Sequence, residues 1–331
     1  MSHDRTNQFS LMTMTCDKLL SKDHPYRRLA AIFDVGRVAQ RFESLYSKIG
    51  SQAIPVEQGV RALIVQFLED YSDRQMERAL AENITVKWYC GFELGQATPD
   101  HTYFCKLRKR LGTKSIAELF ASVRDAFCAR GLVSDVFQFV DSSAIITKTA
   151  LWEERDRAIA DGLEKLDNQT VKKYAADKDA RTGCKGKKKF WFGYKRHVNV
   201  DMKSGLITKV AVTSANLPDG KATKSILREG GRVFADKAYS EGSGHAAICA
   251  KGCHSGAIKK RNRKDKNRDL DKWLTRVRMP YEGVFARCRR RARYRGRAKV
   301  QLQAFMEAVV HNLKRAVRIE AAVSQLATAS P

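Results

Sequence analysis

The stretch VFQFVDSSAI, from Val136 to Ile145, is the part of the sequence that decides the fold class. Its β-prone apolar run predicts a buried strand, and this run stops at Asp141. Four of its first five residues are apolar, as in a buried strand. A second run, GRVFADKAYS from Gly231 to Ser240, stops at Asp236. Functional sites of α/β proteins assemble at strand ends. One such aspartate is usually a turn residue, but two of them indicate strands that end at a functional site.

The residues around these runs predict an α/β domain. Further strands are expected at 192–201 and 205–215, and helices at 221–228 and 300–323. The segment from about 150 to 189 is rich in both charges and has no apolar run, which predicts a surface insertion with one helix.

That insertion ends in the basic run KGKKK, from Lys185 to Lys189, followed by three aromatic residues. The run fits either a solvated loop before a strand or a contact with phosphate.

Residues 1 to about 54 are mixed, with a helical signal around Pro25 to Ile49, and the following residues up to 130 predict helices. Pro55 begins a run with apolar residues at helical spacing, and Ser72-x-x-Gln75 has the pattern of a capping box. A short basic helix is expected from His101 to Leu111, and another helix that Gly131 terminates. The fold class is therefore α/β, with an all-α N-terminal domain over 1–130 and a second domain over 131–320.

The charge balance indicates an anionic partner. The chain has 62 Lys and Arg against 36 Asp and Glu, a net charge of +26, and residues 251–300 hold 19 basic and 4 acidic residues. Such a surplus destabilises a compact state by self-repulsion unless an anion offsets it. Double-stranded DNA is the natural partner. An acidic membrane surface is the weaker alternative, because no amphipathic anchor or lipidation motif is present.

No apolar run approaches the roughly 20 residues of a transmembrane helix, and the N-terminus has no signal-peptide pattern. We therefore expect a cytoplasmic protein whose eight cysteines are reduced thiols. His245, Cys249, Cys253 and His254 could supply four zinc ligands, but their spacing matches no common zinc site. A helix and loop with thiols is the simpler interpretation.

Two aspartates at strand ends in so basic a chain predict a divalent metal site that acts on phosphodiesters. Mg²⁺ prefers oxygen ligands, and two metals about 4 Å apart can activate a nucleophile and stabilise the leaving oxygen. A third carboxylate is then needed. Asp265, Asp269 and Asp271 lie in a polar, loop-like run, whereas Glu282 stands where an arginine-rich helix is expected to begin. Glu282 is the better candidate.

Seven blocks of sequence follow one another between about Pro55 and Arg315. They are YSDRQMERALAENITVKWYCGF, PDHTYFCKLRKRLG, FVDSSAI, FGYKRHVNVDMKSGLITKVAVTSANLPD, VFADKAYS, YEGVFARCRRRARYRGRAKVQLQ and HNLKR. In this order they resemble the bacterial insertion-sequence transposases of the DDE type, close to the insertion-sequence-five group. Each block is weak alone, and together they are specific.

The resemblance implies a ribonuclease-H-like catalytic fold with Asp141, Asp236 and Glu282 as its triad. It also implies two Mg²⁺ ions, which Mn²⁺ can replace, held by the same three carboxylates. Water would hydrolyse the DNA at each element end, and the freed 3′-OH would attack a target phosphodiester. Related transposases carry Tyr-x2-Arg-x3-Glu-x6-Lys around the glutamate, and here Arg278 and Glu282 match while Thr275 and Arg289 replace the other two.

The resemblance further implies contacts with DNA phosphates, for which arginine suits because its planar fork binds two oxygens. The expected contacts are Arg278, Arg289, Arg295, Lys299, Lys237 and Tyr239 in the second domain, and Lys106, Arg108, Lys109 and Arg110 in the first. Lys237 and Tyr239 could instead only pack, and the helix with Lys106 could be a solvated charged face. His197 is interpreted as a packed strand residue rather than a general base, because two metals already activate the nucleophile.

These features predict a DNA transposase that acts in the bacterial cytoplasm, on the nucleoid. Its helical domain is expected to bind the terminal inverted repeats, with a homodimer or larger assembly joining two ends. One alternative is a catalytically inactive, transposase-derived DNA-binding protein, although all three carboxylates are present. The other is a ribonuclease-H-like nuclease, which would cut without joining strands.

Overall fold

The computed structural model describes residues 16–46, 54–149, 152–162, 168–186, 189–260 and 262–329. The centre of the KGKKK run and the end of the helical signal expected up to residue 49 lie outside these ranges. The chain forms two compact units, one of residues 1–123 with 316–331 and one of residues 124–315. Within the described ranges, no helix combines the length and apolar character that a membrane crossing requires.

The first unit is built from helices. They are α2 (Cys16–Leu19), α3 (Pro25–Ile32), α4 (Val35–Ala39), the 3-10 helix η1 (Gln40–Leu45), α5 (Val56–Leu68), α6 (Asp73–Glu82), α7 (Ile84–Cys90) and the first part of α8 (His101–Ala129). The expected helix after Pro55 is confirmed as α5, whose inward side chains include the fully buried Val60, Leu63 and Ile64. The capping box is also confirmed, because Ser72 Oγ accepts from the N–H of Gln75 and Gln75 Oε1 accepts from the N–H of Ser72.

Helix α8 is interrupted at Gly112, whose φ of 63° and ψ of −178° lie outside helical conformation. Only glycine adopts such a conformation without strain. The break separates the basic helix from the apolar helix, as the sequence predicted. The apolar part ends at Gly131 (φ 69°), where the N–H of Leu132 donates to the carbonyl of Phe127 at 3.0 Å. This return hydrogen bond satisfies a carbonyl at the helix end.

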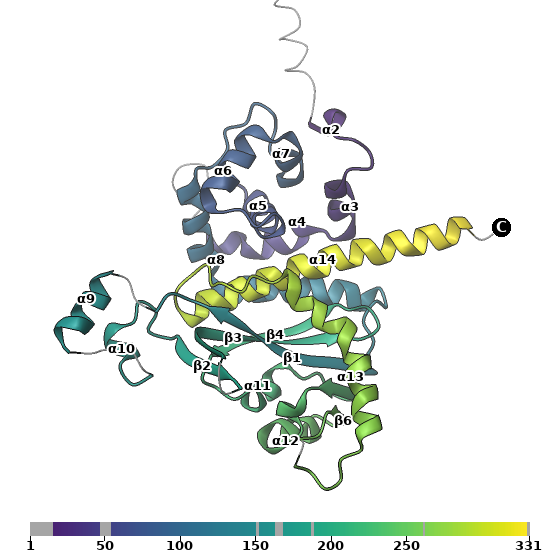
Figure 1. Cartoon of the computed structure of the whole chain (residues 1–331). Coiled ribbons are helices and arrows are strands. Elements are labelled where there is room, and N and C mark those ends of the chain that lie inside the picture. Colours follow the sequence, from purple (N-terminus) through teal and green to yellow (C-terminus); the bar gives the residue numbers. More distant parts are fainter. Residues whose placement is uncertain are drawn as a thin grey trace, which may run out of the picture. The chain divides into compact units, whose positions relative to one another are not determined.

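The second unit contains a six-stranded sheet (Figure 1). Its strands are β1 (Phe137–Ile146), β2 (Arg181–Lys185), β3 (Lys189–Asp201), β4 (Ile207–Ser214), β5 (Arg232–Ala235) and β6 (His254–Ala257). Strand β3 pairs antiparallel with β1, β2 and β4, whereas β5 pairs parallel with both β1 and β6. Three antiparallel strands, β4, β3 and β1, are thus followed by two parallel ones, β5 and β6.

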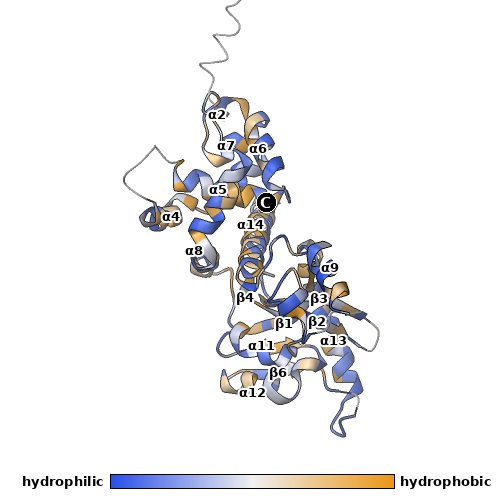
Figure 2. Ribbon diagram, turned by 90° about the vertical axis from the view of Figure 1, so that its left-hand side faces the viewer, coloured by the Kyte–Doolittle hydropathy of each residue, from blue (hydrophilic) through white to orange (hydrophobic). Residues whose placement is uncertain are grey.

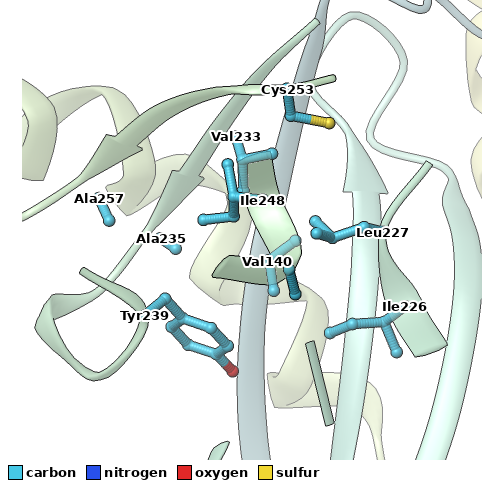
Figure 3. Packing of buried hydrophobic residues seen from close by; sticks show 10 residues of the cluster. Val140, Ile226, Leu227, Val233, Ala235, Tyr239, Ile248, Cys253 and Ala257 are labelled. Carbon is cyan, nitrogen blue, oxygen red and sulfur yellow. The ribbon is translucent and has the colours of Figure 1, made fainter. Parts of the chain in front are cut away.

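One face of this sheet is covered by α11 (Asp219–Ile226) and α12 (Gly242–Ala250). The core between them contains Val140 of β1, Ala235 of β5 and Ile248 of α12, all fully buried (Figure 3). Burial of such side chains contributes roughly 1.5–3 kcal/mol each for the larger aliphatic ones. This core fixes the position of the two strands that precede the candidate aspartates.

The other face is covered by α13 (Arg268–Glu282) and by the part of α14 (Arg297–Ala329) that belongs to this unit. The ring of Tyr281 lies 5.9 Å from that of Phe139 on β1. Gln301 and Asn312 of α14 accept hydrogen bonds from backbone N–H groups of β4, at 2.6 and 2.7 Å. Helix α13 therefore lies over β1 and β5, and α14 lies over β4.

The structure corrects the prediction that the first strand ends at Asp141. Strand β1 continues to Ile146, because its antiparallel ladder with β3 extends from Gln138, opposite Asp201, to Ile146, opposite Gly193. The prediction is right for the other run, where Ala235 is the last residue of β5.

The charged insertion and the segment around Glu282 also differ from expectation. The insertion contains two helices, α9 (Trp152–Ala160) and α10 (Val171–Tyr174), and strand β2, so the prediction of a single helix is wrong. Helix α13 begins inside the hydrophilic segment that was expected to be a loop (Figure 2). It ends at Glu282, and a short 3-10 helix, η3 (Gly283–Arg287), follows in place of the expected arginine-rich helix.

Candidate active site

Asp141 and Asp236 follow paired residues of two adjacent parallel strands. Val140 pairs with Ala235 in the β1–β5 ladder, so Asp141 in β1 and Asp236 directly after β5 are neighbours. Phe139 and Phe234, two residues earlier, both contact aromatic residues of α13. Because side chains alternate along a strand, the two aspartates project on the same face as these rings. Asp236 also accepts the N–H of Ala238 at 2.8 Å, which begins a 3-10 turn, η2 (Lys237–Tyr239).

Glu282 reaches the same site from the end of α13. Helix α13 is fixed on β1 by the contact between Tyr281 and Phe139, and its last residue is Glu282. The Glu282 side chain is 53% exposed, so it lies at the mouth of the site rather than within it.

Arg278 joins the carboxylates. Its Nη2 lies 3.6 Å from Asp141 Oδ2 and 3.6 Å from Glu282 Oε1. Its side chain is only 6% exposed, and its guanidinium carbon lies 5.6 Å from the centre of the Phe139 ring. The resemblance implied a phosphate contact for Arg278, and the structure buries its side chain beside two of the candidate carboxylates.

The electrostatics of the site raise the pKa of Asp141 to about 6. Burial is the main cause, and the negative charges of Asp236 and Glu282 add to it, while the N–H of Ser142 and the Arg278 guanidinium oppose it. Three carboxylates thus act on one another with a single guanidinium between them. An added cation would favour the ionised form of all three.

The donor set fits a hard divalent cation, because three carboxylates supply only oxygen ligands. Among the described residues, no three His, Cys, Asp or Glu side chains are grouped closely enough to hold a metal ion. Asp141 and Glu282 instead share the Arg278 guanidinium, whose Nη2 lies 3.6 Å from an oxygen of each.

The other candidates for a third carboxylate are engaged at the far end of α13. Asp265 pairs with Lys259 and Arg263, and Asp271 pairs with Lys266. Asp269 lies in the first turn of α13, which at 1.5 Å per residue is about 20 Å from Glu282. Of the four candidates, only Glu282 lies beside Asp141.

An arginine-rich segment runs alongside the end of β1. The N–H of Ile146 donates to the carbonyl of Arg290 at 2.7 Å, and the N–H of Ala292 donates to that of Ile146 at 2.8 Å. The side chains of Arg289, Arg290, Arg291, Arg295 and Lys299 are exposed. Sequence reasoning selected the first and the last two of these residues. It missed Arg290 and Arg291, for which the run of three consecutive arginines was the available signal.

Lys237 and Tyr239 separate in the structure. Lys237 is exposed directly after Asp236. Tyr239 is fully buried, with its ring in the core cluster beside Val140 and Ala235 (Figure 3). Its expected DNA contact is therefore corrected to packing, because its side chain lies in the core while that of Lys237 faces solvent.

His197 is a buried strand residue. It pairs with Ser142 in the β1–β3 ladder, and its Nε2 lies 2.8 Å from Thr213 Oγ1. Burial lowers its pKa to about 4, with Lys195 adding to the effect and Asp219 opposing it. Its neighbour Val198 is the residue that pairs with Asp141, so His197 projects from the opposite face of the sheet.

The basic helix of the first unit divides its cations between two roles. Arg108 forms a two-point ion pair with Asp73, at 2.8 and 2.6 Å, and Arg110 lies 4.2 Å over the ring of Tyr46. Lys106 and Lys109 are exposed. Of the four expected DNA contacts, Arg108 has its guanidinium engaged by Asp73.

The histidine and cysteine cluster does not converge. Cys253 is buried and its sulfur lies 3.1 Å from the carbonyl oxygen of Gly230. Cys249 is exposed on α12, with its sulfur 3.6 Å from His245 Nε2, and His254 begins β6.

Comparison with known proteins identifies two domains. The family model "Transposase domain (DUF772)" matches residues 14–110, and the family model "Transposase DDE domain" matches residues 165–313. Asp236 and Glu282 lie within the second match, and Asp141 precedes it. Together with the sheet of three antiparallel and two parallel strands, this match confirms the expected α/β, ribonuclease-H-like class.

One similar solved structure is described as "Cryo-EM structure of piggyBac transposase synaptic complex with hairpin DNA (SNHP)". It is 8% identical in sequence, and the alignment covers 94% of this chain and 75% of that one with a TM-score of 0.42. A similarity at this TM-score carries no argument about the site.

Proposed function

This chain belongs to the DDE transposases, a family that depends on a divalent metal, and from that premise we propose that Asp141, Asp236 and Glu282 hold the metal of its reaction. The observation that carries the proposal is the parallel register that sets Asp141 beside Asp236. Glu282 joins them through the shared contact with Arg278.

The metal is proposed to be a pair of Mg²⁺ ions, for which Mn²⁺ can substitute. Three carboxylates with one guanidinium leave a surplus of negative charge, and oxygen ligands match this choice. When bound, the ions would activate the attacking oxygen and stabilise the leaving one. No serine or tyrosine nucleophile is then required, which agrees with the buried position of Tyr239.

The reaction is proposed to have two steps at this one site. In the first, water attacks the phosphorus at an element end, the bond to the 3′ oxygen breaks, and a 3′-OH and a 5′-phosphate result. In the second, this 3′-OH attacks a target phosphodiester, and the target's own 3′ oxygen leaves. Asp141 is proposed to serve both metals, because Asp236 neighbours it through the β1–β5 register and Glu282 through the shared contact with Arg278.

The DNA is proposed to run along the arginine-rich segment beside β1. Arg289, Arg295 and Lys299 are exposed there, and the backbone contact at Ile146 fixes the segment on the strand that carries Asp141. Lys237 adds an exposed cation directly after Asp236. The exposed Lys185 and Lys189 of the β2–β3 hairpin favour the phosphate-contact interpretation of the KGKKK run over the plain loop.

The helical N-terminal domain, residues 1–130, is proposed to bind the terminal inverted repeats, leaving catalysis to residues 131–320. Lys106, Lys109 and Arg110 are exposed cations on the basic helix. The proposed reaction joins two element ends, so we also propose at least a homodimer during synapsis, in a bacterial cytoplasm. The resemblance to the insertion-sequence-five group supports these assignments.

A transposition assay in cells tests the proposed function. The gene with its native flanks is placed on a donor plasmid, and insertions into a recipient plasmid are counted and sequenced. We expect wild type and Asp269→Ala to insert equally, because Asp269 is exposed at the other end of α13. Glu282→Gln, which keeps the shape and removes the charge, should lower insertion at least a hundredfold.

Equal insertion by Glu282→Gln would contradict the assignment of the third carboxylate. If wild type cleaves the element ends but forms no joined products, the proposed attack of the 3′-OH on target DNA would be contradicted and a nuclease would be favoured.

A further inference from the structure

We propose that Arg278 is an internal counter-ion of the carboxylate site, one that competes with the divalent cation for Asp141 and Glu282. This inference rests on the proposed function of these carboxylates. It assigns Arg278 a role in setting metal affinity in the DNA-free protein, in addition to the phosphate contact expected from the sequence.

Arg278 lies buried beside two of the candidate carboxylates. One nitrogen, Nη2, lies 3.6 Å from Asp141 Oδ2 and 3.6 Å from Glu282 Oε1. The side chain is buried against the Phe139 ring. A buried guanidinium in this place acts on the charge of both carboxylates.

The hydrogen bonding of Arg278 is incomplete. Charge-assisted hydrogen bonds to carboxylates normally measure about 2.7–2.9 Å, so both 3.6 Å contacts are charge contacts without full hydrogen bonds. Arg278 Nε is buried and has no hydrogen-bond partner among the described residues. The guanidinium is therefore retained by the negative charge around it rather than by satisfied donors. Such a cation is poorly compensated, and the carboxylate oxygens keep lone pairs free for another ligand.

A metal ion at these carboxylates would lie close to the positive charge of Arg278. A divalent cation held by Asp141 or Glu282 would bind to a carboxylate that already lies 3.6 Å from Arg278 Nη2. A guanidinium so close to a divalent cation repels it strongly at the reduced dielectric of a partly buried site. The metal-free site is thus neutralised in part by Arg278, and metal binding has to overcome that charge.

Mn²⁺ binding to the DNA-free, full-length protein tests this inference, with free Mn²⁺ followed by electron paramagnetic resonance. Arg278→Gln should bind Mn²⁺ roughly tenfold more tightly than wild type, because the competing charge is removed. Arg278→Lys keeps the charge and should bind as wild type does. Arg276→Gln is the matched control, since it removes an exposed positive charge from the same helix and should also leave the affinity unchanged.

Folding of each variant is checked by thermal unfolding in EDTA. If Arg278→Gln does not fold, Arg278→Met takes its place, because an unbranched apolar chain retains the packing on Phe139 while removing the charge. Unchanged or weaker Mn²⁺ binding by the folded charge-free variant would overturn the counter-ion role.

Asp141→Asn separates this failure from a failure of the proposed function. It should weaken Mn²⁺ binding at least tenfold if the carboxylates form the metal site. Wild-type affinity in Asp141→Asn would overturn the metal site itself, and with it both proposals.

Discussion

Replacing His197 by glutamine should make the protein less sensitive to acid. His197 is fully buried, its Nε2 is 2.8 Å from Thr213 Oγ1, and its Nδ1 has no hydrogen-bond partner among the described residues. Burial lowers its pKa from 6.5 to about 4, and the charged groups that act on it are Asp219 and Lys195. The folded protein therefore keeps His197 neutral at a pH where the unfolded chain already binds a proton.

The sign and size of the effect follow from this difference. The contribution of neutral His197 to stability is fully present above pH 6.5 and is lost as the pH falls toward 4. At about 1.4 kcal/mol for each pH unit, complete loss amounts to about 3 kcal/mol. That is a large share of the roughly 5–15 kcal/mol by which whole domains are stable.

The assay is urea unfolding of the full chain at pH 7.5 and 4.5, for wild type, His197→Gln and the control His254→Gln. His254 is exposed at the start of β6, so its replacement should leave the pH dependence as in wild type. Between the two pH values, wild type should lose about 2–3 kcal/mol more free energy of unfolding than His197→Gln does. Equal losses in the two proteins would refute the interpretation that the imidazole of His197 is buried and neutral in the folded protein.

Three further predictions test other parts of the account. Arg108→Ala should lower the free energy of unfolding by about 2 kcal/mol, because it breaks charge-assisted hydrogen bonds. It should leave DNA affinity unchanged. A loss of DNA affinity in the folded variant would contradict a role of Arg108 confined to the ion pair with Asp73. Lys109→Ala should weaken DNA binding and reduce the slope of log affinity against log salt by about 1, measured by fluorescence anisotropy; an unchanged slope would remove Lys109 from the interface. Glu307→Ala should cost about 3–5 kcal/mol in thermal or urea unfolding, because it leaves the buried Arg196 guanidinium without its ion-pair partner; a cost below about 1 kcal/mol would contradict that pairing.

Local sequence patterns predicted the elements whose signals lie within one turn or one strand. The capping box at Ser72, the break between the two parts of α8 and the end of β5 before Asp236 depend on neighbouring residues alone. The continuation of β1 beyond Asp141 does not, because polar residues remain in that strand through their pairing with β3. A strand end cannot be placed from an apolar run when a distant strand supplies the hydrogen bonds.

In the candidate site too, local sequence signals identify some residues, whereas contacts between distant segments determine how they are arranged. The two aspartates could be selected because each follows an apolar run, but their adjacency depends on the parallel register of β1 and β5. The burial of Arg278 and Tyr239 depends on which face of α13 and η2 packs on the sheet. The resemblance implied a DNA contact for both residues, with packing left open for Tyr239. The pairing of Arg108 with Asp73 is likewise a contact between two helices.

The most direct test of the central claim is affinity cleavage with Fe²⁺ in place of Mg²⁺. Ascorbate and peroxide generate hydroxyl radicals at the bound iron, and mass spectrometry locates the resulting breaks in the backbone. If Asp141, Asp236 and Glu282 share the metal, wild type will be cut near all three residues and Asp141→Asn near none of them. Cuts near residues 265–271 in place of Glu282, or an unchanged pattern in Asp141→Asn, would contradict the account.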